Sequence, residues 1–147
     1  MNILKCILIA AILTIFGCAT MRVDPGGHFS GYVERITRTQ QTKEMVIIDY
    51  ECDSACLILL SSGPGLRISK HSRFGVHEAR FVVPGTNYWD DTSRRTELGT
   101  NYLKSQIPEC AVKLFETKHA FDRPDLTYFT GAQVLKACPE IQEYIAK

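Results

Sequence analysis

The chain has 147 residues, a length typical of one domain, and its 17 Lys and Arg residues nearly balance its 16 Asp and Glu residues. This balance argues against a polyanion-binding surface or an acidic tail. The sequence has no basic cluster and its aromatic residues are scattered, so we expect no nucleic-acid partner.

The first eighteen residues have the pattern of an export signal. One positive charge at Lys5 precedes the apolar run Ile7–Phe16, which is short for a membrane-spanning helix. The end of this run, Ile15 to Cys18, resembles a bacterial lipobox, in which the cysteine is lipidated and becomes the first residue. An ordinary secretory signal and an uncleaved membrane anchor are the alternatives. All three predict a protein of the bacterial cell envelope (periplasm), with residues 19–147 as one domain and the lipid on Cys18 as its membrane anchor.

Export makes the cysteines interpretable. Without Cys6 and Cys18, four remain, at positions 52, 56, 110 and 138, which is an even number in an oxidising compartment. Four cysteines allow three pairings, and the sequence alone cannot choose among them. We favour Cys110–Cys138, which would join the C-terminal helices, together with Cys52–Cys56. Zinc is the rival interpretation, but the Cys-x3-Cys spacing lacks a second pair of ligands, so we predict no metal.

A turn, a helix and a strand are predicted next. Asp24-Pro25-Gly26-Gly27 is a turn whose glycines can adopt positive φ and leave N–H groups open to a ligand. Apolar residues at helical spacing predict a helix over Phe29–Thr39. Gln40–Glu44 is expected to be a polar linker, and Met45–Asp49 a buried strand.

Ser54 lies where this strand gives way to a second helix. The apolar run Ala55–Leu60 follows it and stops at a Ser-Ser-Gly-Pro sequence. Free backbone N–H groups and the helix dipole at such a junction favour negative charge, so a nucleophilic serine there would have an oxyanion stabiliser in the backbone. The alternative is that Ser54 only caps the helix. A further extended segment is expected around Arg73–His77.

The second half is expected to be mostly helical. Phe81–Asp91 is rich in Pro, Gly and Asn and predicts a long loop. Helices are predicted over Ser93–Ile107 and from Pro108 through Phe115. Thr130 to Gln133 forms a capping-box pattern that opens a helix. Pro139 is expected to open a last helix with Ile141, Tyr144 and Ile145 as its apolar residues.

The order of these segments resembles the Clp-protease and crotonase-like superfamily, and most closely its small exported ClpP-like periplasmic members. The resemblance lies in the Pro-Gly-Gly turn, Ser54-Ala55 between two cysteines and Gly75-Val76-His77. It covers roughly residues 22–85 well and the rest loosely. It implies a truncated ClpP/crotonase-like ββα-type α/β fold with C-terminal helices. It also implies that Ser54 is the nucleophile, that His77 is the base, and that the N–H groups of Gly26 and Ala55 form the oxyanion hole.

The resemblance places the third member of a catalytic triad shortly before the capping box. Asp125 is at about the right distance, and Asp122 is the second choice. Such an acid would hold His77 in the correct tautomer. The alternative is that both aspartates lie in a solvated turn, which would leave a Ser–His dyad.

Two functions of different classes follow from these expectations. The first is an exported serine hydrolase that acts by acyl transfer on a peptide substrate without a cofactor. The second is a catalytically inactive binding or assembly module of the envelope. It is favoured by Asp53, whose charge beside Ser54 opposes oxyanion formation unless it points away. It is also favoured by the short N-terminal part, which leaves the sheet truncated and in need of a partner or a second copy to complete it.

Overall fold

The computed structural model describes residues 22–82, 89–90 and 93–146. The predicted signal and the lipidation site at Cys18 therefore lie outside the described residues. Within these ranges no helix has the length and apolar character needed to cross a membrane.

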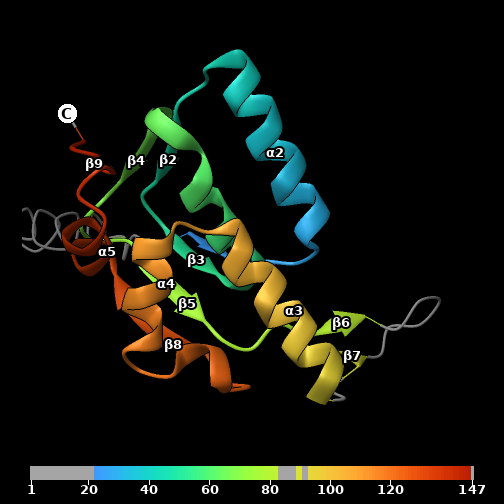
Figure 1. The fold of residues 1–147 in the computed structure, drawn as a ribbon. Coiled ribbons are helices and arrows are strands. Elements are labelled where there is room, and N and C mark those ends of the chain that lie inside the picture. The colour runs from blue at the N-terminus through green and yellow to red at the C-terminus, as the bar shows by residue number, and fades with distance from the viewer. Residues whose placement is uncertain (1–21, 83–88, 91–92, 147) are drawn as a thin grey trace, which may run out of the picture.

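The fold is mixed α/β and contains two main sheets (Figure 1). Three short strands, β1, β3 and β5, run parallel in the first sheet, and β8 is antiparallel to β5 at its edge. The second sheet is parallel, in the order β2-β4-β9. The strands of the first sheet are β1 (Val23–Asp24), β3 (Glu51–Asp53), β5 (Arg73–Val76) and β8 (Thr127–Thr130), and those of the second are β2 (Val46–Ile48), β4 (Leu66–Ile68) and β9 (Gln142–Glu143).

The chain crosses twice from the second sheet to the first, from β2 to β3 and from β4 to β5. Backbone hydrogen bonds join the two crossing segments to each other. Ser69 N–H donates to Ile48 O at 2.9 Å, and Arg73 N–H donates to Tyr50 O at 3.4 Å. The predicted strand Met45–Asp49 is therefore observed as β2, and pairing resumes after Tyr50 as β3. This second strand is what carries the chain to Ser54.

A buried helix lies at the centre of the molecule. The 3₁₀ helix η1 (Ser54–Ser61) buries every residue from Ala55 to Leu60. Helix α2 (Phe29–Thr42) packs along it, and α3 (Ser93–Gln106) contacts it as well. A helix that is apolar all round must be covered on all sides, and η1 meets this requirement between the helices and the sheets. The remaining helical segments are η2 (Gly63–Gly65), α4 (Glu109–Glu116), η3 (Ala120–Asp122) and α5 (Gly131–Ala137).

Several local predictions are confirmed. Helices α3 and α4 match the predicted segments, and Thr130 and Gln133 form the reciprocal capping box that opens α5. Helix α2 runs farther than expected, through Thr42. It ends at Lys43, which adopts the left-handed conformation with φ 57°. Of the residues predicted as a polar linker, Gln40 to Thr42 thus form the exposed last turn of α2, and Lys43 and Glu44 follow it.

The predicted helix after Pro139 is wrong. Ile141 is buried, and the chain beyond it forms β9 beside β4. Tyr144 N–H donates to Ile68 O at 2.8 Å, which extends this pairing. Strand β4 pairs with β2 on one side. Without β9, its other side would be an open edge, and the C-terminal segment satisfies the backbone groups there.

The segment predicted as a long loop contains a strand pair. Strands β6 (Phe81–Val82) and β7 (Trp89–Asp90) are antiparallel and project from the rest of the fold near the start of α3 (Figure 1).

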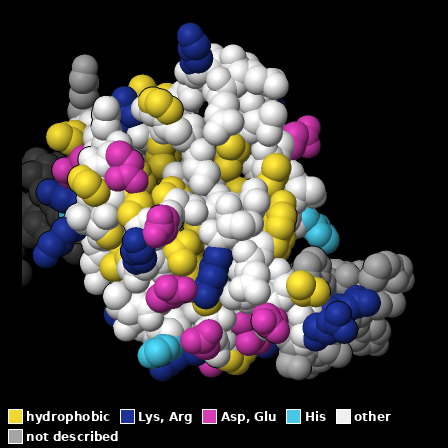
Figure 2. Space-filling view, in the orientation of Figure 1, with side chains coloured by type: hydrophobic (Ala, Val, Ile, Leu, Met, Phe, Trp, Pro, Cys, Tyr) yellow, Lys and Arg dark blue, Asp and Glu magenta, His cyan; other side chains and the backbone are white. Residues whose placement is uncertain are grey.

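Charge is distributed evenly over the surface seen in Figure 2. Acidic and basic side chains are interspersed there, with apolar side chains between them. The described residues on this face form no extended patch of one sign, in agreement with the net charge of +1.

Candidate functional site

The Asp24–Gly27 turn has the backbone that its glycines predict. Gly26 has φ 80° and Gly27 has φ 147°, values that side-chain-bearing residues rarely adopt. The Asp24 carboxylate closes the turn, because Oδ1 accepts hydrogen bonds from Gly26 N–H at 3.1 Å and from the Tyr32 hydroxyl at 2.5 Å. Burial, and then the hydrogen bond to Asp24, raises the pKa of Tyr32, so the phenol remains a donor.

Ser54 lies on a strained turn between β3 and η1. Its φ is 55°, in the left-handed region that costs a non-glycine residue free energy. A disulfide joins Cys52 in β3 to Cys56 in η1, and both cysteines are fully buried. The disulfide closes a small loop around Ser54 and limits the conformations that this turn can adopt. Both pairings favoured from the sequence, this one and Cys110–Cys138, are present in the structure.

The glycine turn lies directly against Ser54. A Cβ atom added to Gly26 would lie 2.5 Å from Asp53 O, 2.8 Å from Ser54 Cβ and 2.9 Å from Ala55 N. All three distances are shorter than real Cβ contacts, so no larger residue fits at position 26 without a shift of the Ser54 turn. The turn and the start of η1, 28 residues apart in the sequence, are therefore in contact at the site.

One cavity brings together three of the residues that the resemblance implies. It has a volume of about 300 Å³ and contains Gly26, Ser54 and His77 in its lining. The other described residues of the lining are mainly apolar or small, and one is a cation: Pro25, Gly27, Phe29, Ala79, Pro124 and Arg80. A pocket of this size matches the lower range of small-molecule sites.

His77 follows β5 at the edge of this cavity and is half-buried. Burial lowers the pKa of His77 below its usual value, which favours the neutral imidazole that a general base requires. No hydrogen bond joins Ser54 to His77 among the described residues. Such bonds are often long without substrate, so the shared cavity is the geometric link between these two side chains.

The two implied oxyanion donors differ in their surroundings. Ala55 lies in the first turn of η1, where a helix leaves N–H groups without an intrahelical acceptor. In contrast, Gly26 N–H already donates to Asp24. The neighbouring Gly27 N–H has no acceptor among the described residues.

The structure does not connect the implied acids to His77. Asp125 is exposed and makes no hydrogen bond or ion pair within the described chain. Asp122 is also exposed and lies 3.6 Å from His119 Nδ1. The described site therefore consists of Ser54 and His77 without a third member.

Asp53 has a different role from the one its position suggested. The residue is only 5% exposed and does not line the cavity. Among the described residues Oδ1 has no hydrogen-bond partner, and it lies over Gly75 in β5, 2.1 Å from where a Cβ would be. Burial, followed by the nearby Glu51 charge, raises the pKa of Asp53 to about 6. The carboxyl thus points toward the neighbouring strand, and its ionisation lowers the stability of the fold.

Sequence reasoning missed several cavity residues. Phe29 was identified only as part of a helix stripe, and Ala79, Arg80 and Pro124 were not singled out. Arg80 comes three residues after His77, which is the one local signal that could have drawn attention to it.

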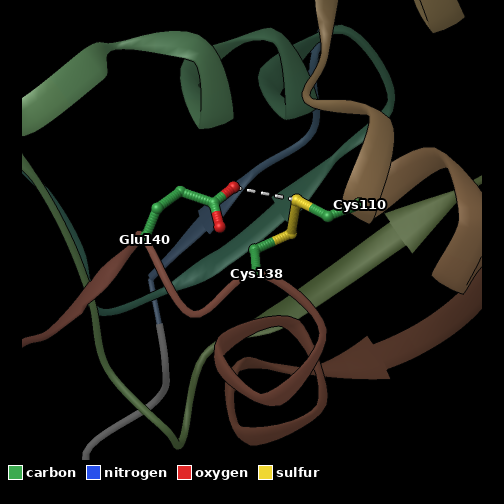
Figure 3. Close-up of side chains that lie close together, drawn as sticks. All are labelled: Cys110, Cys138 and Glu140. Atoms are coloured by element: carbon green, nitrogen blue, oxygen red, sulfur yellow. Dashed lines mark hydrogen bonds between the residues drawn. A yellow bond between two sulfur atoms is a disulfide. The ribbon is translucent and has the colours of Figure 1, made fainter.

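The second disulfide lies in the C-terminal half of the chain. Glu140 Oε1 lies 3.1 Å from Cys110 Sγ, and the ligand atoms of Cys110, Cys138 and Glu140 are within 4.8 Å of one another (Figure 3). Metal binding needs thiolates, and these two sulfurs are joined to each other. The cluster in this state is therefore a structural cross-link.

Comparison with protein-family models and with curated proteins found no match for this chain. The function is therefore inferred from the geometry of the site.

Proposed function

We propose that the chain is an exported serine hydrolase of ClpP/crotonase-like type that acts as a peptidase. The observation that carries this proposal is that Gly26, Ser54 and His77 line one cavity, although they come from three separate segments. The strained conformation of Ser54 adds support, because nucleophilic serines are often presented on sharp strand-to-helix turns.

In the proposed reaction, Ser54 Oγ attacks the substrate carbonyl and His77 accepts its proton. The tetrahedral oxyanion receives a hydrogen bond from Ala55 N–H. The glycine turn supplies a second donor, either Gly27 N–H or Gly26 N–H after release from Asp24. His77 then returns the proton to the leaving group, and water hydrolyses the acyl intermediate by the same steps.

Without an acid, His77 depends on its packing and on the backbone of Glu78 for its orientation. A Ser–His dyad of this kind is a weaker catalyst than a full triad, because the imidazolium is less well stabilised. We therefore propose slow turnover, with Asp125 able to contribute only if the turn that carries it moves.

The second candidate function is a catalytically inactive envelope module. It is favoured by the hydrogen bond between Asp24 and Gly26, which occupies one implied oxyanion donor. Strand β1 is also only two residues long in the described chain and forms an edge of its sheet, next to β3. A partner or a second copy could extend the sheet there.

Both candidate functions imply a location in the cell envelope. The two disulfides support it, since such bonds persist in oxidising compartments. Lipidation at Cys18 would place the domain at a membrane surface.

Labelling with a fluorophosphonate probe tests the hydrolase directly. The purified, oxidised domain is treated with the probe and the adduct is mapped by mass spectrometry. We expect an adduct on Ser54 that disappears in Ser54→Ala and His77→Ala. The control is His71→Ala, because His71 is exposed and lies outside the cavity lining. A folded, oxidised domain without an adduct would support the binding module instead.

A further inference from the structure

We propose that the Ser54 cavity selects acyl groups whose side chain ends in a carboxylate, and that Arg80 is the residue that recognises it. This inference rests on the proposed hydrolase function and adds a substrate class to it. Among the described residues that line the cavity, Arg80 is the one permanently charged side chain, and most of the others are apolar.

The walls of the cavity suit a short aliphatic stem. Pro25, Phe29, Ala79 and Pro124 present apolar surface, and the glycine turn opens the approach to Ser54. A volume of about 300 Å³ has room for a group the size of one amino-acid side chain with its backbone. An acyl group in this position would have its carbonyl at Ser54 and its side chain between these walls.

Arg80 is fixed in place by its neighbour. Its Nε and Nη2 atoms both donate to Glu78 Oε1, at 3.1 and 2.8 Å, and the two side chains are 33% and 22% exposed. Glu78 is itself anchored, since its backbone N–H donates to Arg123 O at 2.8 Å. The guanidinium is therefore held before substrate arrives, which lowers the entropic cost of binding.

The pairing with Glu78 leaves part of the guanidinium unused. Arginine has five N–H donors, and the contacts with Glu78 use two of its three nitrogens. Nη1 has no hydrogen-bond acceptor among the described residues. Glu78 does not line the cavity, so its carboxylate does not take the place that a substrate carboxylate would occupy.

The charge of Arg80 also reaches the base. Burial is the main cause of the lowered His77 pKa, and the positive charge of Arg80 lowers it further. Arg80, His77 and Ser54 line the same cavity, so a group bound at Arg80 would lie in the cavity that contains the reacting atoms. A charge-assisted hydrogen bond to a substrate carboxylate would therefore form within the site.

A matched substrate pair tests this inference. The p-nitrophenyl esters of N-acetylglutamate and N-acetylglutamine differ in charge and hardly in shape, and Ser54→Ala measures the uncatalysed rate of each. We expect the wild-type protein to favour the glutamyl ester in kcat/KM by roughly tenfold to a hundredfold, the usual range for a hydrogen bond to a charged group. In Arg80→Gln this ratio should fall to about one through loss of the glutamyl ester reaction.

Two further variants separate charge recognition from general damage. Arg80→Lys keeps the positive charge and should retain most of the preference. Arg38→Gln makes the same change in net charge on the exposed face of α2, outside the cavity lining, and should leave the ratio unchanged.

The outcomes distinguish the two proposals. If both esters are hydrolysed above the Ser54→Ala rate but Arg80→Gln leaves the ratio unchanged, this inference is wrong and the hydrolase proposal stands. If neither ester is hydrolysed and the fluorophosphonate probe leaves Ser54 unmodified, the hydrolase proposal fails and this inference fails with it.

Discussion

The two disulfides differ in what they can do for the molecule. Cys52–Cys56 spans four residues and is fully buried beside Ser54, whereas Cys110–Cys138 spans 28 residues and joins α4 to the end of α5. In the chain-entropy model, closing these loops stabilises the fold by about 2 and about 3.5 kcal/mol respectively. The longer loop therefore contributes more to stability, although it is farther from the site.

This difference assigns the two cross-links to separate roles. A short loop removes little entropy from the unfolded chain, so the main effect of Cys52–Cys56 is on the local conformation. Ser54 needs such a constraint, because its φ of 55° is unfavourable for a residue with a side chain. Cys110–Cys138 instead connects segments that carry no cavity residue.

The largest expected effect on stability is from removal of the long cross-link. Cys110→Ala together with Cys138→Ala should lower the free energy of unfolding by about 3.5 kcal/mol. Urea denaturation of the oxidised proteins measures this loss. Fluorophosphonate labelling of Ser54 in the fraction that remains folded should be unchanged. A strong loss of labelling in folded protein would contradict the separation of roles.

Removal of the short cross-link should reduce stability less and Ser54 labelling more. Cys52→Ala with Cys56→Ala is expected to cost about 2 kcal/mol of stability. The rate of Ser54 labelling should fall at least tenfold, since misplacing a reacting group by about 1 Å can cost a hundredfold. Measuring both quantities on the same sample makes the comparison direct, and an unchanged labelling rate would show that the disulfide does not position Ser54.

Asp53 tests whether ionisation of a buried carboxyl next to Ser54 destabilises the fold. Burial raises its pKa from 3.8 to about 6, so the folded state holds the proton more tightly than the unfolded state. Stability should then decrease as the pH rises from about 4 through 6, where the carboxyl ionises in the fold. Asp53→Asn should be more stable than wild type by about 1–2 kcal/mol at pH 8, with this gain lost near pH 4. Thermal unfolding at both pH values measures the difference, and an equal gain at both would contradict a charge effect.

The smallest expected effect concerns the cap of α5. Thr130 Oγ1 accepts a hydrogen bond from Gln133 N–H at 3.3 Å, and Thr130 N–H donates to Gln133 Oε1 at 2.8 Å. Thr130→Ala should cost about 1 kcal/mol, the usual value for an N-cap. Ser54 labelling should stay at the wild-type rate, because the cap supports the half of the chain that contains the long cross-link. Chemical denaturation and labelling together check this result.

Local signals allowed much of the fold around the site to be predicted. The positive φ values of the glycine turn, the strand-to-helix junction at Ser54 and the Thr130 cap each depend on residues close together in the sequence. Export predicted disulfides among the four remaining cysteines but left three pairings open, and the observed pairing was a preference among them. The glycine turn, the junction and the cap need no knowledge of distant contacts.

Features that depend on distant contacts were missed or wrong. Strand β9 forms because the edge of β4 is open to it, and nothing in residues 139–147 reveals that neighbour. Strand β8 was not predicted for the same reason, since its pairing with β5 spans more than 50 residues. Arg80 and Pro124 meet at the cavity only after the fold has formed. The third catalytic residue was inferred from resemblance alone, and Asp125 is exposed in the structure.

The pH dependence of Ser54 labelling by a neutral fluorophosphonate shows whether His77 is the base that activates Ser54. If His77 activates Ser54, the labelling rate should be independent of pH near neutrality and fall in acid with a midpoint below 6.5, because burial lowers the pKa of His77. In His77→Ala most of the labelling rate should be lost, and the rate that remains should show no such fall in acid. A rate that rises steadily with hydroxide concentration, equally in wild type and His77→Ala, would contradict the account.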